Sequence, residues 1–219
     1  MTWALVPLKS PETAKSRLAT VLSPGERRAL FFALAQRVIA ALQATPGIER
    51  VVVVTASEEV AAFARGLEAQ VLRQPADTGT AEAFVLGLEQ LKPLALDRVL
   101  MIAGDLPLLQ PAALQALLDA ADDGAQIVLA PDRRRLGTNA LLCTPPQAIE
   151  PVFGEDSFSR HYAAALARGY ASCVVELEAL SLDLDTPADL DEWQRLQAMS
   201  GKRSTMRADA GRHQRELRA

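Results

Sequence analysis

Apolar positions along this chain follow two different periods, and each period predicts a different element. Short apolar runs without alternation occur at TWALVP (2–7), RVVVVT (50–55), RVLMIAG (98–104), AQIVLA (125–130) and TNALLC (138–143). Runs of aliphatic and β-branched residues with this pattern are typical of strands that are covered on both faces. Shorter runs at 70–73 and 171–177 predict two further strands.

Between these runs, apolar residues recur every three or four positions and predict helices. The clearest helix begins at Ser23, where Pro24 and Glu26 complete a capping-box pattern, and its apolar face continues to Leu42. The same period predicts helices over 57–69, 78–91, 111–121, 157–169 and 186–199. Strands that alternate with helices predict an α/β fold, with a mainly parallel sheet and helices on both faces. In such sheets ligands bind beyond the carboxyl ends of the strands.

Composition narrows the class of protein. Hydrophobic residues make up 49% of the 219 residues and aromatic residues only 5%, which is typical of one globular domain. No apolar run reaches the roughly 18 uncharged residues that a membrane helix needs, and the N-terminus lacks a signal-peptide pattern. We therefore expect a cytoplasmic protein without a membrane partner. Cys143 and Cys173 lack the spacing of a zinc site and are expected to be buried free thiols.

Charge divides the chain into an acidic body and a basic tail. The chain has a net charge of −4, yet the tail over 199–219 carries six Lys and Arg residues against two Asp and Glu residues. Because this tail is poor in apolar residues, we expect it to be disordered and the folded domain to span 1–198. No aromatic residues interleave the basic ones, so nucleic acid is not the expected partner.

A first polar segment follows the first strand. The loop VPLKSPETAKSRL contains Lys9, Lys15 and Arg17, and cations of this spacing beside backbone N–H groups can surround a polyphosphate. A solvated basic loop is the alternative. Neither GxGxxG nor GxxxxGKS occurs in the chain, so the usual dinucleotide and P-loop signatures are missing.

Three aspartates form the second group of polar residues. Asp105 follows the apolar strand that ends at GD, with no lysine or arginine adjoining it, and Asp183 and Asp185 lie two apart in LSLDLDTPADL. In an extended segment that spacing puts both carboxylates on one face about 7 Å apart, where they repel each other. Mg²⁺ would relieve this repulsion because it prefers carboxylate, phosphate and water oxygens. The alternative is that Asp185 caps the last helix and Asp183 is solvated.

The third group lies in APDRRRLGTNALL and FGEDSFSRH. Thr138 and Asn139 follow three consecutive arginines, and Gly154 and Ser157 precede or open the next helix. Exposed N–H groups at such a helix start can bind a phosphate or a carboxylate, and Ser157 can also act as the N-cap. For His161 a packing or surface role is favoured over catalysis, and at least one arginine is expected to be solvated.

Together these three groups suit nucleotidyl transfer. If the nucleophile is a phosphate oxygen, it is already ionised at neutral pH and no strong base is required. Positioning and charge neutralisation then supply most of the acceleration. The lack of an obvious His or Cys catalyst agrees with this chemistry.

The motifs quoted above, together with GDLPLL, resemble the 2-phospho-L-lactate guanylyltransferase family of deazaflavin (coenzyme F420) biosynthesis. GDLPL occurs in many nucleotidyltransferases, whereas GTNAL and FGxxSFxxH in that order are specific, and the resemblance runs from about Trp3 to Trp193. It implies a single-domain, three-layer fold of the nucleotide-diphospho-sugar-transferase type over 1–198, which uses GTP and Mg²⁺.

The resemblance also implies roles for individual residues. Asp105, Asp183 and Asp185 match the family's metal ligands. The phosphorylated acid would be held by Thr138, Asn139, Gly154 and Ser157, and the catalytic set is Lys9, Lys15, Arg17 and Asp105. Nucleotide contacts fall on Pro7, Leu8, Lys9, Asp77, Gly79 and Thr80. In the last of these segments DTGTAEAF departs from the Gly-Leu-Asn-Ala helix start of many members, so the choice of GTP is less firmly implied.

The family uses 3-phospho-D-glycerate, phosphoenolpyruvate or 2-phospho-L-lactate as the acceptor, and we expect them in that order from the Ala- and Arg-rich composition. All three combine a phosphate with a carboxylate. The alternatives are another nucleotidyltransferase or a glycosyltransferase of the same fold, or a nucleotide-binding protein without catalytic activity. Apolar helix faces that remain uncovered allow a homodimer.

Overall fold

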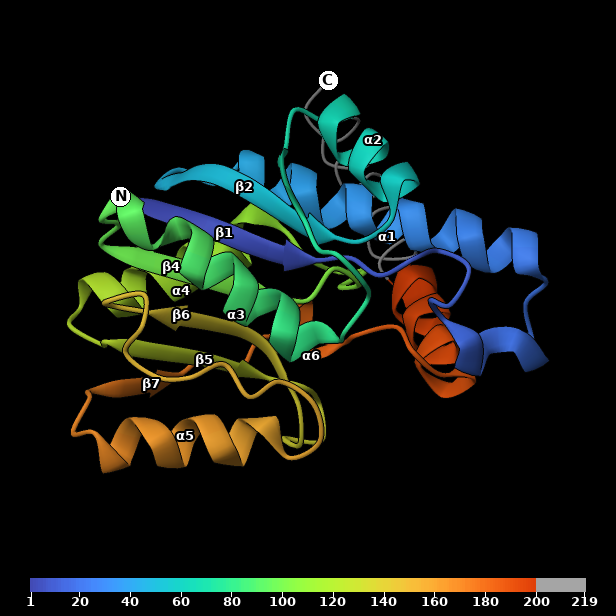
Figure 1. Ribbon diagram of the computed structural model, residues 1–219. Coiled ribbons are helices and arrows are strands. Elements are labelled where there is room, and N and C mark those ends of the chain that lie inside the picture. Colours follow the sequence, from blue (N-terminus) through green and yellow to red (C-terminus); the bar gives the residue numbers. More distant parts are fainter. Residues whose placement is uncertain (200–219) are drawn as a thin grey trace, which may run out of the picture.

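The computed structural model describes residues 1–199 and shows a central sheet between two layers of helices (Figure 1). Within these residues the sheet has seven strands in the order β3-β2-β1-β4-β6-β5-β7. β6 runs antiparallel to β4 and β5, whereas the other neighbours are parallel. The strands are β1 (Thr2–Pro7), β2 (Ile48–Thr55), β3 (Gln70–Arg73), β4 (Arg98–Ile102), β5 (Ile127–Pro131), β6 (Thr138–Cys143) and β7 (Ser172–Val174).

The helices divide between the two faces because alternate strand residues point to opposite sides. Val6 of β1 packs in one core cluster with α1 (Pro24–Gln43), α2 (Glu58–Gly66), α4 (Pro111–Asp122) and α6 (Glu178–Ser181). The adjacent Leu5 packs in a second cluster with α3 (Thr80–Leu91) and α5 (Ser157–Ala167). The predicted α/β class with helices on both faces is confirmed.

Local signals set the ends of several helices as expected. At α1 the Ser23 hydroxyl accepts from the Glu26 N–H, and the Glu26 carboxylate accepts from the Ser23 N–H at 2.8 Å, so the capping box is present. A last helix covers 187–199, close to the predicted 186–199. No helix within residues 1–199 combines the length and hydrophobicity that crossing a bilayer requires.

The structure corrects three details of the predicted elements. β7 ends at Val174 instead of continuing to residue 177, because the chain turns there into the short helix α6, which was not predicted. The loop after β1 contains a 3-10 helix, η1 (Ser16–Thr20), whose Leu18 is fully buried. Leu18 packs in a small third cluster with Leu34, Leu184 and Leu190, which joins this loop to α1 and to the helix over 187–199.

The proposed boundary at residue 198 and the homodimer stay predictions. The tail over 199–219 lies, apart from Met199, outside the described residues.

Candidate active site

The carboxyl end of β4 is the point where the three predicted aspartates meet. After Ile102 the chain stays in the sheet for one more residue, since the Ala103 N–H donates to the Asn139 carbonyl at 2.8 Å. Gly104 then passes close to the end of β1: a Cβ at this position would lie 2.4 Å from Cδ2 of Leu8. The absence of a side chain at Gly104 therefore allows the turn that places Asp105 at the sheet edge.

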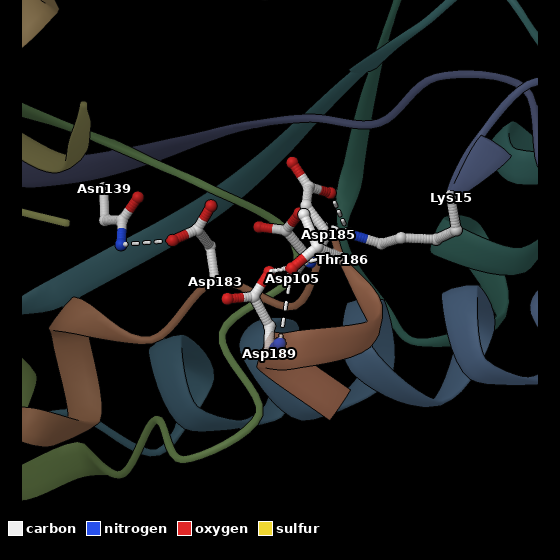
Figure 2. A network of polar contacts seen from close by, with 7 residues as sticks. All are labelled: Lys15, Asp105, Asn139, Asp183, Asp185, Thr186 and Asp189. Carbon is white, nitrogen blue, oxygen red and sulfur yellow. Dashed lines mark hydrogen bonds and ion pairs between the residues drawn. The ribbon is translucent and has the colours of Figure 1, made fainter. Parts of the chain in front are cut away.

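Asp105 is not left unpaired, and its partner comes from a distant part of the chain. Lys15 donates from Nζ to Oδ2 of Asp105 at 2.5 Å and to Oδ1 of Asp185 at 2.9 Å (Figure 2). The Lys15 side chain is only 5% exposed. Burial by itself lowers the pKa of Lys15, but the charges of Asp105 and Asp185 outweigh it and raise that pKa to about 12. Lys15 is therefore a permanently charged centre of the site.

The backbone conformation at Lys15 directs its side chain toward Asp105 and Asp185. Lys15 has a left-handed φ of 57° and is the N-cap of η1, and the buried Leu18 of η1 anchors the segment. A non-glycine residue in this conformation is uncommon and must be held by its surroundings. Here the two ion pairs and the packing of η1 hold it.

Asp183 lies beside this pair but has a different partner. The Asn139 amide of β6 donates to the Leu180 carbonyl at 3.0 Å and, over a longer 3.4 Å, to Oδ1 of Asp183 (Figure 2). Burial, followed by the negative charges of Asp105 and Asp185, raises the pKa of Asp183 to about 6. Burial is thus the main cause of the raised pKa of Asp183, and the two neighbouring carboxylates add to it.

A capping box, missed in the sequence, holds the segment that carries Asp183 and Asp185. The Asp189 carboxylate accepts from the N–H and the hydroxyl of Thr186, both at 2.7 Å, and from the Asp185 N–H at 3.2 Å. Thr186 in turn accepts from the Asp189 N–H at 3.3 Å. The pattern TPAD could have revealed this cap. The alternative in which Asp185 caps the helix and Asp183 is solvated is wrong, because Thr186 makes the cap and Asp183 is partly buried.

The donor set suits a hard divalent cation, although the side chains as placed do not enclose one. Asp105, Asp183 and Asp185 offer only carboxylate oxygens, which are the protein ligands that hard divalent cations prefer. In residues 1–199, however, no group of three His, Cys, Asp or Glu side chains is arranged to hold a metal ion. Lys15 lies between two of the three carboxylates instead. The magnesium assignment therefore stays a prediction that fits the chemistry of the residues.

Two of the residues predicted to bind the acceptor have side chains that are engaged inside the protein. The Thr138 N–H donates to Oγ of Ser157 at 2.9 Å, which joins β6 to α5. The Thr138 hydroxyl lies 2.9 Å from Nδ1 of His161, and Nε2 of His161 accepts from the Val152 N–H at 2.9 Å. Nε2 must therefore be unprotonated, so Nδ1 carries the proton and donates to Thr138. Their assignment to the acceptor stays a prediction.

His161 has the structural role that the sequence favoured over catalysis. It is fully buried, and burial followed by the charge of Arg160 lowers its pKa to about 4. A neutral imidazole with both nitrogens bonded has no free position for proton transfer to a substrate. Its function is to tie the loop at Val152 to β6.

The start of α5 differs from the expected cap. Asp156, with a left-handed φ of 52°, is the N-cap and makes no side-chain bond to the helix, so Ser157 is the first helical residue and not the cap. Gly154, with a φ of 126°, is exposed and has open space around it. This end of α5 has no side-chain cap, but its first two N–H groups are already bonded, that of Ser157 to the Gly154 carbonyl at 3.2 Å and that of Phe158 to the Leu136 carbonyl at 3.0 Å.

The three consecutive arginines have separate environments. Arg133 forms an ion pair with Glu192 and Arg135 with Glu176, whereas Arg134 is exposed and has no ion-pair partner among residues 1–199. This agrees with the expectation that at least one of them is solvated.

The predicted nucleotide contacts flank the aspartates on β1 and α3. Pro7 ends β1, and Leu8 is buried with its N–H bonded to the Val54 carbonyl, so the side chain of Leu8 belongs to the core. Gly79, with a φ of 119°, is the N-cap of α3 and no side chain caps that helix start. Thr80 follows it and Asp77 is exposed. Their contacts with a nucleotide stay predictions.

Lys9 and Arg17 lie in the same loop as Lys15 but behave differently. Both are exposed, and within the described part of the chain neither forms an ion pair. Two cations of this loop are thus available to an anionic ligand, while the third, Lys15, is held by the aspartates.

A surface hollow of the protein lies away from these residues. A hollow of about 490 Å³ between α1 and α2 is lined by Gly25, Arg28, Phe32 and Phe63, among others, and contains none of the predicted residues. The charge cluster at β4, not the size of a hollow, therefore identifies the candidate site.

Comparison with known proteins agrees with this geometry. A family described as "Guanylyl transferase CofC like" matches residues 2–204. A phosphoenolpyruvate guanylyltransferase of Conexibacter woesei is 42% identical over 191 residues, which cover 87% of this chain and 86% of the relative. A 3-phospho-D-glycerate guanylyltransferase of Phenylobacterium zucineum is 36% identical, over 88% of this chain and 89% of the relative. A 2-phospho-L-lactate guanylyltransferase of Methanothermobacter thermautotrophicus is 35% identical, over 87% and 83%.

Solved structures with low sequence identity share the fold. A protein of Desulfovibrio desulfuricans named as a nucleotide-diphospho-sugar transferase superposes with a TM-score of 0.73 at 16% identity, over 86% of this chain and 84% of that one. A nucleotidyl transferase of Methanothermobacter gives a TM-score of 0.62 at 18% identity, over 90% and 99%. The predicted fold type is therefore confirmed.

Proposed function

This chain belongs to the CofC-like guanylyl transferase family, whose reaction is a step in the biosynthesis of coenzyme F420, and we propose that its own acceptor is phosphoenolpyruvate. In the proposed reaction a phosphate oxygen of the acceptor attacks the α-phosphorus of GTP. The bond from the α-phosphorus to the bridging oxygen breaks, and pyrophosphate leaves with the electron pair. GMP is thereby joined to the acceptor through a new phosphate–phosphate bond.

The observation that carries this proposal is the cluster of Lys15, Asp105, Asp183 and Asp185 beyond the carboxyl end of β4. Nucleotidyl transfer to a phosphate needs charge neutralisation and alignment more than it needs a base, because the nucleophile is already ionised. The only histidine in residues 1–199 is the buried, neutral His161, which agrees with a reaction that uses no imidazole.

We assign the cation-binding role to the three aspartates. Asp105, Asp183 and Asp185 would hold Mg²⁺, which when bound would supply positive charge beside the triphosphate and make pyrophosphate a better leaving group. Asn139 supports this role by donating to Asp183, and the Thr186–Asp189 cap supports it by fixing the backbone at Asp185.

The cations of the first loop would orient the triphosphate. Lys9 and Arg17 are exposed on the same loop as Lys15, so their side chains can reach a ligand that approaches the end of β1. Point charges and N–H groups of this kind bind phosphates without fixing the base. Recognition of guanine is assigned to the α3 end of the site, around Gly79 and Thr80, where the helix start is uncapped.

The names of the relatives support phosphoenolpyruvate over the other two acids. Relatives at 41–42% identity are phosphoenolpyruvate guanylyltransferases, whereas the 3-phospho-D-glycerate and 2-phospho-L-lactate enzymes described above are 36% and 35% identical. We therefore place phosphoenolpyruvate ahead of 3-phospho-D-glycerate, which composition had favoured. All three acids combine a phosphate with a carboxylate, so we assign the acceptor to one anion site near the start of α5, beside the exposed Gly154.

The experiment is a matrix of nucleotides and acids. Purified protein with Mg²⁺ is incubated with each of four nucleoside triphosphates and each of the three acids, and pyrophosphate and the coupled product are measured, the latter by mass. We expect GTP with phosphoenolpyruvate to react fastest. An Asp183→Asn variant is the matched inactive control. Faster turnover with another acid would overturn the acceptor assignment, and no pyrophosphate with any pair would overturn the catalytic assignment.

A further inference from the structure

Lys15 occupies an unusual position for a residue of a phosphate-binding loop. Its ammonium group contacts two of the three carboxylates that are proposed to hold the cation, at 2.5 and 2.9 Å, and its side chain is 5% exposed (Figure 2). Lys9 and Arg17 of the same loop are exposed. Lys15 is thus withdrawn from the ligand side of the loop, while its two neighbours face solvent.

The charges explain why a cation must be present at this point. Three carboxylates lie near one another at the end of β4, and the ammonium group of Lys15 contacts only two of them, those of Asp105 and Asp185. Without a compensating positive charge the ionised cluster would be destabilising. Lys15 compensates Asp105 and Asp185, which are also two of the proposed ligands of the divalent cation.

The two roles compete for the same two carboxylates. Lys15 uses Oδ2 of Asp105 and Oδ1 of Asp185, and an ammonium group and Mg²⁺ that share these two carboxylates repel each other. The side chain of Lys15 can move away from the aspartates, because its only described polar contacts are with those two carboxylates. The same contacts help to hold the left-handed φ of Lys15, so losing them would also free the backbone.

From this geometry, and resting on the proposed magnesium-dependent function, we propose that Lys15 is a built-in substitute for the divalent cation. In the nucleotide-free protein its ammonium group neutralises Asp105 and Asp185. Binding of the cation displaces it from these carboxylates and makes its positive charge available to the triphosphate. Binding of the cation would therefore also place the charge of Lys15 where the phosphate-binding loop can use it.

The first test uses the wild-type protein and its sparse lysines. The chain has lysines only at positions 9, 15, 92 and 202, so acetylation by an amine-reactive ester can be followed at each one by peptide mass spectrometry. Lys92 is the internal reference, because it is exposed and lies at the end of α3, before β4 begins. We expect Mg²⁺ without nucleotide to increase the labelling of Lys15 several-fold relative to Lys92.

The second test measures cation affinity directly, with Mn²⁺ as the probe and electron paramagnetic resonance of the free ion as the readout. Lys15→Met removes the proposed competitor, and Lys92→Met is the control that makes the same change in net charge at a remote exposed site. We expect Lys15→Met to bind Mn²⁺ about tenfold or more tightly than Lys92→Met, equal to about 1.4 kcal/mol. Mg²⁺ should also raise the melting temperature of Lys15→Met more than that of the control.

The outcomes separate this inference from the proposed function. Unchanged labelling of Lys15 at Mg²⁺ concentrations that support turnover, or equal Mn²⁺ affinity in the two variants, would overturn the inference and leave the enzyme assignment intact. Wild-type protein that makes product without any divalent cation would remove the magnesium site and the inference together. If Lys15→Met does not fold, the labelling of the wild-type protein alone decides.

Discussion

Lowering the pH from about 7 to about 5 should destabilise this protein through one buried side chain, His161. In the folded state its pKa is lowered from 6.5 to about 4, mainly by burial. The imidazole accepts a hydrogen bond from the Val152 N–H, and protonation would replace that acceptor with a second donor. The unfolded chain therefore binds a proton more readily than the folded chain does.

The magnitude follows from the two pKa values. A difference of about 2.5 between 6.5 and 4 corresponds to about 3.4 kcal/mol, because one pKa unit is worth about 1.36 kcal/mol. His161 contributes this stability in full above pH 6.5, and the contribution is lost progressively as the pH falls toward 4. Between about pH 7 and 5 the loss is about 2 kcal/mol.

Asp183 changes the stability in the opposite direction as the pH falls, so its effect must be separated from that of His161. Its pKa is raised from 3.8 to about 6, so the folded state binds its proton more tightly and gains stability as the pH falls through that window. The wild-type curve alone would mix the two effects. A His161→Asn variant keeps a donor near the Nδ1 position but cannot titrate, so its difference from wild type isolates the histidine.

The assay is urea unfolding followed by circular dichroism and tryptophan fluorescence, with both proteins at about pH 7, 6 and 5. His161→Asn should be less stable than wild type at neutral pH, because the Val152 N–H loses its acceptor. The difference in free energy of unfolding between the two proteins should narrow by about 2 kcal/mol at the lowest pH. A difference in free energy of unfolding that stays constant across this range would refute the argument that His161 is neutral and hydrogen-bonded in the folded state.

Three further substitutions test the candidate site. Asp183→Asn should abolish turnover and yet raise the free energy of unfolding by about 1–3 kcal/mol at neutral pH without divalent cations, since it removes a buried charge that also lies near two other carboxylates. A variant that is less stable in urea unfolding would contradict this. Asn139→Ala should destabilise the fold by about 1–3 kcal/mol, by leaving the Leu180 carbonyl unpaired. In assays of that variant the Mg²⁺ concentration for half-maximal rate should rise, whereas a rise only in KM for the acceptor would mean that Asn139 binds substrate. Gly104→Ala should cost about 1–3 kcal/mol, because its Cβ would lie 2.4 Å from Leu8 and displace it, and thermal unfolding that matches wild type would show that the turn tolerates a side chain.

Much of the fold could be predicted because its signals are local. The capping box at Ser23 and Glu26 was visible as spacing alone, and the run 50–55 was recognisable as a covered strand from its β-branched residues. The order of the strands and the antiparallel direction of β6 were not predictable in this way. Pairing depends on contacts between segments that are far apart in the chain, and periodicity within one segment contains no information about its neighbours.

The candidate site was likewise predictable only in part. The three aspartates were identified from residue type, position at strand ends and family motifs, and they do come together at β4. Lys9, Lys15 and Arg17 were predicted together to surround a polyphosphate, and this stays a prediction. The structure adds that only Lys15 is buried and paired with aspartates. Thr138 and Ser157 were selected as polar residues for a ligand, which stays a prediction. The structure adds that the Thr138 N–H donates to Ser157 Oγ and joins β6 to α5.

The sequence by itself determined most of the elements, the family and the kind of chemistry, because caps, periodicity and motif residues act over a few positions. Only the tertiary structure decided that Asp105 forms an ion pair with Lys15, 90 residues away, and that Asp183 accepts a hydrogen bond from Asn139 of β6 instead. Electrostatic interactions depend on distance in space and on burial, and both arise only when the chain is packed. The pairing of charges, and with it the readiness of the site for a cation, is therefore a property of the fold.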